Sequence, residues 1–196
     1  MVIAVMQPYV FPYLGYYQLV NAVDTFVFFD DVNYIMKGWI NRNRVLQKNQ
    51  PITFTIPLSK ASQNRLINEI ELSEFNRWRD AFLKQIAQYY GKAPYFTEVN
   101  AWLVDFFTKN EFTHISQLAA ESVISVSQLL NLTTSFLYSS KLDYRVEGQN
   151  GQDKILSICE MQNAKMYINL QNGRELYEQI KFKKKILTCG LYILTI

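Results

Sequence analysis

The chain has 196 residues, of which 49% are hydrophobic and 15% aromatic, so it can bury a sizeable core and is not a disordered protein. A net charge of +3 is too small to indicate nucleic-acid binding by charge alone, and no basic helix face or RNA-binding signature accompanies it. We therefore expect one folded domain over residues 1–196 and no nucleic-acid partner.

Cysteine usage and hydropathy favour a cytoplasmic protein. Cys159 and Cys189 are far apart, and Pro8 and Pro12 interrupt the apolar N-terminal run, which differs from a secretory leader. No apolar run approaches the roughly 18 residues that a transmembrane helix needs. The single histidine, His114, gives no metal-site pattern with these cysteines, and the sequence identifies no cofactor.

The first predicted elements are two buried strands with a helix between them. Val2–Gln7 is apolar and β-branched without polar alternation, which predicts a central strand. Pro8 and Pro12 prevent further strand pairing and force a loop or a first helical turn. Tyr13–Val23 has the apolar spacing of a short helix, and Phe26–Phe29 predicts the second buried strand.

The middle of the chain predicts two more strands and a group of helices. Thr53–Pro57 is a strand candidate that ends at its proline, and the alternation of Ile67–Leu72 predicts a half-exposed strand. Amphipathic spacing predicts three helices, and together they form a helical insertion at about residues 76–130. The predicted helices are Asn76–Tyr90, Phe96–Lys109 and Ile115–Leu130.

The last part of the chain predicts a parallel crossover. Thr133–Tyr138 and Lys165–Ile168 are strand candidates, and Lys154–Gln162 between them is a helix, which is a β-α-β unit. Asn172–Gly173 predicts a turn, and the lysine-rich tail 181–196 is atypical and compatible with a terminal strand. The expected fold is α/β, with a mainly parallel sheet flanked by helices in a Rossmann-like three-layer arrangement.

Polar residues follow both of the first two strands. Open α/β sheets bind ligands at the carboxyl ends of their strands, so this edge is the expected site. Gln7 can donate and accept hydrogen bonds, and tyrosine rings suit stacking on a sugar or a base. A turn cap for Gln7 and plain core positions for the tyrosines are the alternatives. The substrate-binding candidates near the first strand are Gln7, Tyr9, Tyr13 and Tyr16.

Asp30 and Asp31 are the catalytic candidates. Successive strand residues point to opposite faces, so we expect only one of them to face the crevice. A carboxylate beside this much apolar surface could serve as a general base for an incoming amine or hydroxyl. A helix or turn cap is the alternative, and as a metal pair the two aspartates are unconvincing.

Beyond the aspartates, a basic and aromatic stretch adds further candidates. Arg42 could bind a carboxylate or phosphate through its guanidinium fork, and Trp39 could stack on a sugar. A solvated basic turn and a buried anchor are the alternative readings. The substrate-binding candidates in this stretch are Asn33, Lys37, Trp39, Asn41 and Arg42. Ser139–Lys141, Asp153 with Lys154, and Arg174 with Tyr177 could reach the same sheet edge, or be caps or surface residues.

The stretch MQPYVFPYLGYYQLVNAVDTFVFFDDVNYIMKGWINRNR and the later GQDKILSICEMQNAKMYIN and GRELY resemble the WbqC-like family of bacterial proteins. The resemblance covers Val2 to about Tyr177. Typical members continue with an aromatic segment and a further helix. The sequence after Lys181 does not resemble either of them.

This resemblance implies a function in surface-polysaccharide assembly. Members occur in O-antigen and other polysaccharide gene clusters, and transfer of glycine or another amino acid onto a sugar has been suggested for them. The resemblance thus implies a cytoplasmic bacterial transferase that adds an amino acid or acyl group to a nucleotide-activated sugar. A non-catalytic ligand-binding or scaffold protein of the same pathway is the alternative. A homodimer is compatible with the sequence.

A weaker similarity concerns the first turn. Nucleotidylyltransferases and pantoate ligases also begin with a strand, a proline- and glycine-bearing turn and a helix, and their turn carries HxGH. The corresponding string is Tyr13-Leu14-Gly15-Tyr16, with tyrosines in place of both histidines. A nucleotidylyltransferase-like enzyme is therefore a third reading, although a shared fold does not transfer an activity.

Overall fold

The computed structural model describes residues 1–144, 151–170 and 188–191. The chain forms two compact units. Unit 1 comprises Met1–Pro8, Pro12–Val32 and Val126–Ile196, and unit 2 comprises Tyr9–Phe11 and Asn33–Ser125.

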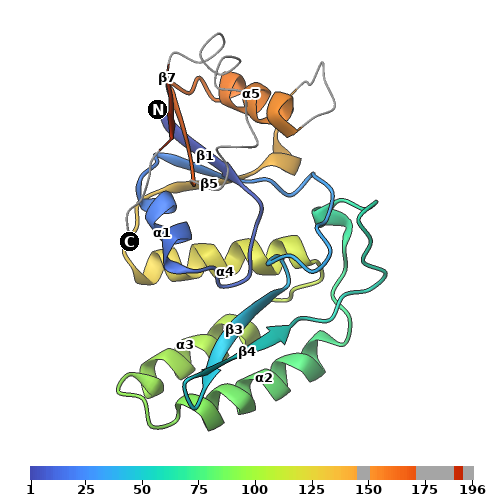
Figure 1. The fold of residues 1–196 in the computed structure, drawn as a ribbon, viewed down its shortest axis with the longest axis vertical. Helices are drawn as coiled ribbons and strands as arrows, with labels where there is room; N and C mark the ends of the chain where they lie inside the picture. The colour runs from blue at the N-terminus through green and yellow to red at the C-terminus, as the bar shows by residue number, and fades with distance from the viewer. Residues whose placement is uncertain (145–150, 171–187, 192–196) are drawn as a thin grey trace. The chain divides into compact units, whose positions relative to one another are not determined.

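Unit 1 is built on a five-stranded parallel sheet (Figure 1). Its strands are β1 (Val2–Met6), β2 (Thr25–Phe28), β5 (Ser135–Tyr138), β6 (Met166–Asn169) and β7 (Thr188–Leu191). Their order is β5-β2-β1-β6-β7, and every neighbouring pair is parallel. The sheet confirms the expected α/β class, and the apolar first strand is central as predicted.

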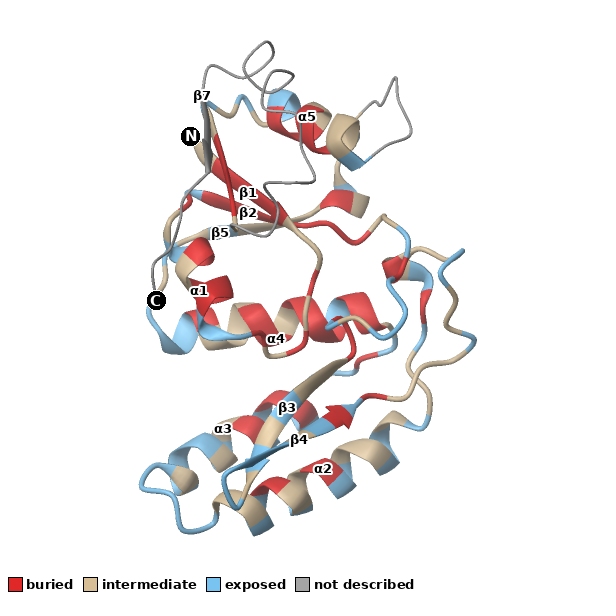
Figure 2. Ribbon diagram, viewed as in Figure 1, coloured by how far each residue is buried: buried red, intermediate tan, exposed pale blue. Residues whose placement is uncertain are grey.

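Two helices cover opposite faces of this sheet (Figure 1). Helix α5 (Gly151–Met161) packs its Ile155 on Val5 and Val27 in one buried cluster. Helix α1 (Leu14–Asn21) places the ring of Tyr16 5.3 Å from that of Phe26, on the other face. Because adjacent strand residues point to opposite faces, an unbroken apolar run such as β1 is buried on both sides (Figure 2).

Unit 2 joins a hairpin to helices. Strands β3 (Arg42–Gln47) and β4 (Gln50–Thr55) pair antiparallel, and Phe54 packs its ring 4.7 Å from Phe82. The hairpin turn has positive φ at both Lys48 (48°) and Asn49 (63°), as a type I′ turn requires. The helices are α2 (Phe75–Tyr90), α3 (Phe96–Lys109) and α4 (Ile115–Leu129), of which α4 belongs to unit 2 as far as Ser125.

In unit 2, one strand prediction is wrong and one strand was missed. The predicted strand Ile67–Leu72 is wrong: Ile67–Glu69 is a 3₁₀ turn, labelled η1. Ile67 and Ile70 are both fully buried, and a three-residue spacing fits the 3₁₀ period and not strand alternation. The strand predicted at Thr53–Pro57 exists as part of β4, but its partner β3 was missed because RNRVLQ is mostly polar.

The predicted helices and the strands of unit 1 are confirmed within a few residues at their ends. In the tail, Thr188–Leu191 pairs with β6 as a terminal strand. The Asn172–Gly173 turn and Arg174 with Tyr177 lie outside the described residues. Within the described ranges, no helix has the length and apolar character to cross a membrane.

Candidate functional site

Asp30 follows β2, and the residues directly after β5 cover its side chain. Its side chain is buried, and its Oδ1 accepts hydrogen bonds from Ser139 Oγ (3.1 Å) and from the Ser140 main-chain N–H (3.0 Å). The Ser140 hydroxyl donates to the other carboxylate oxygen at 2.8 Å. The parallel pairing of β2 with β5 brings these residues together from 110 positions apart in the sequence. Asp30 therefore ties two strand ends to each other.

Asp31 is the more accessible carboxylate. It is half-buried, and its two oxygens accept hydrogen bonds from the hydroxyls of Ser139 and Tyr144. The Lys154 ammonium group donates to the main-chain carbonyl of Asp31 at 2.9 Å. Burial, followed by the hydrogen bond to Asp31 and the charges of both aspartates, raises the pKa of Tyr144 well above its usual value. The Tyr144 hydroxyl therefore stays protonated at neutral pH and donates a hydrogen bond to Asp31.

Ser139 links the two carboxylates. Its fully buried hydroxyl oxygen accepts the Asp30 N–H at 3.1 Å and lies within hydrogen-bond distance of both side chains. A hydroxyl has one proton, so at any moment it donates to one carboxylate only. Asp30 keeps two other donors from Ser140, whereas Asp31 depends on Tyr144. The two neighbouring aspartates differ in accessibility.

Gln7 lies at the same carboxyl edge of the sheet, at the end of β1. Its side chain is half-buried, and no hydrogen bond joins its amide to another described residue. Its main-chain carbonyl accepts a bond from the Tyr16 hydroxyl at 2.9 Å, and Tyr16 itself is fully buried. Tyr13 is 54% exposed. Within the described part of the chain, the Gln7 amide has no hydrogen-bond partner and Tyr13 is exposed, whereas Tyr16 supports the turn.

The remaining predicted site residues belong to unit 2. Asn41 is buried, with its carbonyl oxygen accepting from the Tyr34 hydroxyl and its amide donating to Ile56, both at 2.8 Å, so it supports the local fold. Arg42 donates to the Gly38 carbonyl at 2.9 Å. Of the others, Asn33, Lys37 and Trp39 are exposed and Tyr9 is half-buried. The predicted residues therefore divide between the two units.

Two polar residues at the sheet edge were not predicted. Tyr144 follows β5 inside a polar stretch, where nothing in the sequence sets it apart from a loop residue. Asn169 ends β6; its amide donates to the Tyr167 hydroxyl at 3.0 Å and its oxygen accepts the Leu170 N–H at 2.7 Å. A polar residue directly after a buried strand was the available signal for Asn169. No cluster of metal-binding side chains occurs among the residues that the structure describes.

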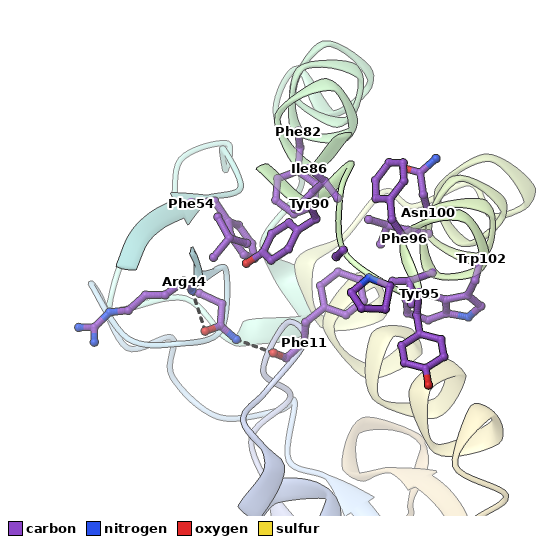
Figure 3. Close-up of a pocket in the computed structure, with 16 residues that line it drawn as sticks. Phe11, Arg44, Phe54, Phe82, Ile86, Tyr90, Tyr95, Phe96, Asn100 and Trp102 are labelled. Atoms are coloured by element: carbon purple, nitrogen blue, oxygen red, sulfur yellow. Dashed lines mark hydrogen bonds between the residues drawn. The ribbon is translucent and has the colours of Figure 1, made fainter. Parts of the chain in front are cut away.

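Unit 2 contains a pocket of about 390 Å³ between the β3–β4 hairpin and helices α2 and α3 (Figure 3). This volume is within the usual range of small-molecule sites, and aromatic rings dominate the walls. The rings belong to Phe11, Phe54, Phe82, Tyr90, Tyr95, Phe96 and Trp102. The Tyr90 hydroxyl accepts the Leu46 N–H at 2.6 Å, which leaves its own proton to donate. The pocket offers apolar contact and a hydroxyl donor, but no acid–base pair.

Comparisons with known proteins agree with the resemblance seen in the sequence. An uncharacterized protein of Mycobacterium tuberculosis, Rv1507c, is 24% identical over 181 residues, which cover 92% of this chain and 77% of that protein. No solved structure matches the chain. The model of the WbqC-like protein family matches residues 7–190, so the similarity continues past Lys181, where the sequence predicted that it would end. The chain belongs to the WbqC-like protein family.

Proposed function

We propose that the protein is a group-transfer enzyme that adds an amino acid or acyl group to a nucleotide-activated sugar. The observation that carries this proposal is the half-buried Asp31 carboxylate, held by two hydroxyls at the carboxyl edge of a parallel sheet. Ligands of open α/β sheets bind at this edge. A partly buried, hydrogen-bonded carboxylate can accept a proton from an attacking amine or hydroxyl.

Each residue of the edge then has a role. Asp31 takes the proton of the sugar amine or hydroxyl as that atom attacks the carbonyl carbon of an activated donor, such as a thioester. The new bond forms to the sugar, the bond from the carbonyl carbon to its carrier breaks, and the proton passes to the departing carrier. Tyr144 and Ser139 are positioning residues that orient Asp31, and Gln7 and Tyr13 bind the substrate. Asp30 anchors Ser139 and Ser140.

The nucleotidylyltransferase reading is less well supported. That reading needs the residue at Tyr16 to contact phosphate, but Tyr16 is fully buried and donates its hydroxyl proton to the Gln7 carbonyl. A non-catalytic binding protein stays as the second candidate. It is favoured by the hydrogen bonds that already occupy both oxygens of Asp31, because a binding protein needs no free base.

The test is product formation from nucleotide sugars and activated amino-acid or acyl donors, followed by mass spectrometry. We expect Asp31→Asn to lower turnover at least a hundredfold, because general-base catalysis typically contributes a factor of about 10²–10⁴. Its thermal shift with the sugar nucleotide should remain. Asp143→Asn removes an exposed carboxylate two residues from the 3₁₀ turn Ser139–Lys141 and should act like wild type.

Asp30→Asn separates structure from chemistry. It replaces a buried acceptor of three hydrogen bonds by an amide that presents protons to some of those donors, so it should cost about 1–3 kcal/mol of stability. A ligand-induced shift without product in the wild type would favour the binding-protein reading. Full turnover in Asp31→Asn would overturn the assignment of the base.

A further inference from the structure

Three large apolar side chains are exposed on one tight turn of unit 2. Ile35 and Met36 are each 51% exposed and Trp39 is 41% exposed. The Gly38 N–H donates to the Ile35 carbonyl at 3.1 Å, and Lys37 has a φ of 60°, so the turn has a defined conformation. Isolated apolar residues on a surface are common, but three within five positions of one turn form a projecting apolar tip.

Two cations lie over the tryptophan of this tip. The guanidinium carbon of Arg42 is 5.4 Å from the centre of the Trp39 ring, and that of Arg44 is 5.1 Å from it. Neither guanidinium forms an ion pair with an acidic side chain in the described part of the chain. Because Arg42 and Arg44 are two positions apart on β3, they project from the same face of the hairpin. Two positive charges are thus held together without a compensating carboxylate.

The charge of the surrounding segment is strongly one-sided. Residues 33–68 contain no Asp or Glu but six basic residues: Lys37, Arg42, Arg44, Lys48, Lys60 and Arg65. The rest of the chain holds 14 Lys and Arg against all 17 Asp and Glu, a net charge of −3. The modest charge of the whole protein therefore conceals a segment that is entirely basic. Such a segment attracts an anionic partner.

We propose that this surface, formed by Ile35, Met36, Lys37, Trp39, Arg42 and Arg44, binds an anionic lipid bilayer. A site for a free phosphate needs the cations but does not need apolar side chains exposed beside them. A bilayer interface uses both, because indole rings prefer the head-group level and apolar side chains enter the acyl boundary. Basic residues next to such a tip add attraction to anionic lipids.

Vesicle sedimentation tests the proposal with the full chain. The protein should sediment with vesicles of phosphatidylcholine and phosphatidylglycerol, and not with vesicles of phosphatidylcholine alone. Raising the salt from about 0.1 M to 1 M should release it, because the Debye length falls from roughly 10 Å to 3 Å. Lys37→Gln with Arg44→Gln should weaken binding about 25-fold, since each basic residue contributes roughly a factor of five.

Two pairs of variants serve as matched controls. Lys84→Gln with Lys92→Gln removes two exposed cations elsewhere in unit 2 and should weaken binding much less. Ile35→Ser with Met36→Ser should weaken binding at least tenfold. Leu129→Ser with Leu130→Ser should not, although these leucines are similarly exposed, at 56% and 50%. Tryptophan fluorescence should shift to the blue on anionic vesicles, and Trp39→Phe should abolish the shift.

The proposal would be overturned by a lack of sedimentation with anionic vesicles at low salt, by equal losses in target and control variants, or by wild-type binding of the variant that combines Ile35→Ser with Met36→Ser. Displacement from vesicles by millimolar inorganic phosphate would instead identify a soluble anion as the ligand, and would also overturn it. None of these readouts depends on turnover, so they are independent of the proposed transferase activity.

Discussion

Asp30 and Asp31 are adjacent in sequence but have different surroundings. The first is buried beneath Ser139 and Ser140, and the second is half-buried beside Tyr144 and Lys154. Both carboxylates lie within hydrogen-bond distance of the Ser139 hydroxyl, but the residues after β5 bury only Asp30. Asp30 therefore anchors the local structure, whereas Asp31 is accessible enough to contact a ligand.

The environment of Tyr144 makes a prediction about alkaline stability. Its pKa in the folded protein is raised, chiefly by burial, above the ordinary tyrosine value of about 10. Its contribution to stability is therefore complete below about pH 10 and is lost as the pH rises toward the folded-state pKa. In urea titrations, Tyr144→Phe should lose less unfolding free energy between about pH 8 and pH 11 than wild type does. Tyr95→Phe, at a 74% exposed position, should keep the wild-type loss; an equal loss in both variants would contradict the prediction.

The sequence alone indicates part of this site. Gln7, Asp30 and Asp31 could be found because each follows a buried apolar run, and parallel strands end at one edge. Ser139 and Ser140 could be suspected for the same reason. The hydrogen bond from Tyr144 to Asp31 spans 113 positions and depends on the path of a loop, which local patterns do not encode. The burial of Tyr16 and Asn41 was equally hidden, because tyrosine and asparagine suit both surface and core.

At the scale of elements, the β3–β4 hairpin is closed by residues that are unusual for its turn. Type I′ turns favour Asn-Gly because both central residues have positive φ, whereas this chain has Lys48 and Asn49. A β-carbon at positive φ costs energy that glycine avoids and asparagine reduces. The rest of the hairpin must therefore stabilise the turn, and Phe54 packing on Phe82 supplies such a contact.

Replacing the turn should stabilise the protein. We expect Lys48→Asn with Asn49→Gly to raise the free energy of unfolding by about 1 kcal/mol, because the turn no longer strains a lysine. Chemical denaturation with a fluorescence readout measures this change. Lys48→Ala is the control, since it removes the same charge but keeps a side chain poorly suited to positive φ. A similar rise in the free energy of unfolding of Lys48→Ala would show that the stabilisation comes from removing a positive charge in this basic segment.

Elements with strong periodicity could be predicted, and those with mixed patterns could not. The predicted helix Phe96–Lys109 has the same bounds as α3, because its apolar residues recur at helical spacing only. The buried pair Ile67 and Ile70 was misread because Leu72 extended an apparent alternation. Strand β3 was missed because its arginines and asparagine suggest a loop, and only its partner β4 makes it a strand. Pairing is a property of two segments, so a single-segment pattern is insufficient.

At the scale of the whole molecule, the chain enters unit 2 twice, first for the three residues Tyr9–Phe11 and later for Asn33–Ser125. Phe11 has a φ of 43°, and its N–H donates to the Ser122 hydroxyl at 2.9 Å. Its ring lies 5.5 Å from that of Phe106 and 6.1 Å from that of Trp102. The side chain of Asn43 donates to the carbonyls of Val10 and Phe11. A short excursion of the chain thus supplies a central ring of the unit 2 core.

Truncating that ring should loosen unit 2. Phe11→Ala should lower stability by about 2–4 kcal/mol, somewhat less than full deletion of a buried phenylalanine because Phe11 is half-buried. Hydrogen exchange of the α3 amides should accelerate, because α3 carries the rings that Phe11 contacts. Leu14→Ala changes a 64% exposed residue just after this segment and should have little effect. Unchanged exchange in α3 would show that the ring contributes little to packing.

The position of β1 has a consequence for biosynthesis. Its partner β2 follows β1 within about twenty positions of the chain, but its other neighbour, β6, begins only at Met166. At roughly 5–20 residues per second, a nascent chain therefore carries an unsatisfied apolar strand edge for many seconds. Such edges recruit other chains, so chaperones that shield the nascent chain should raise the yield of this protein.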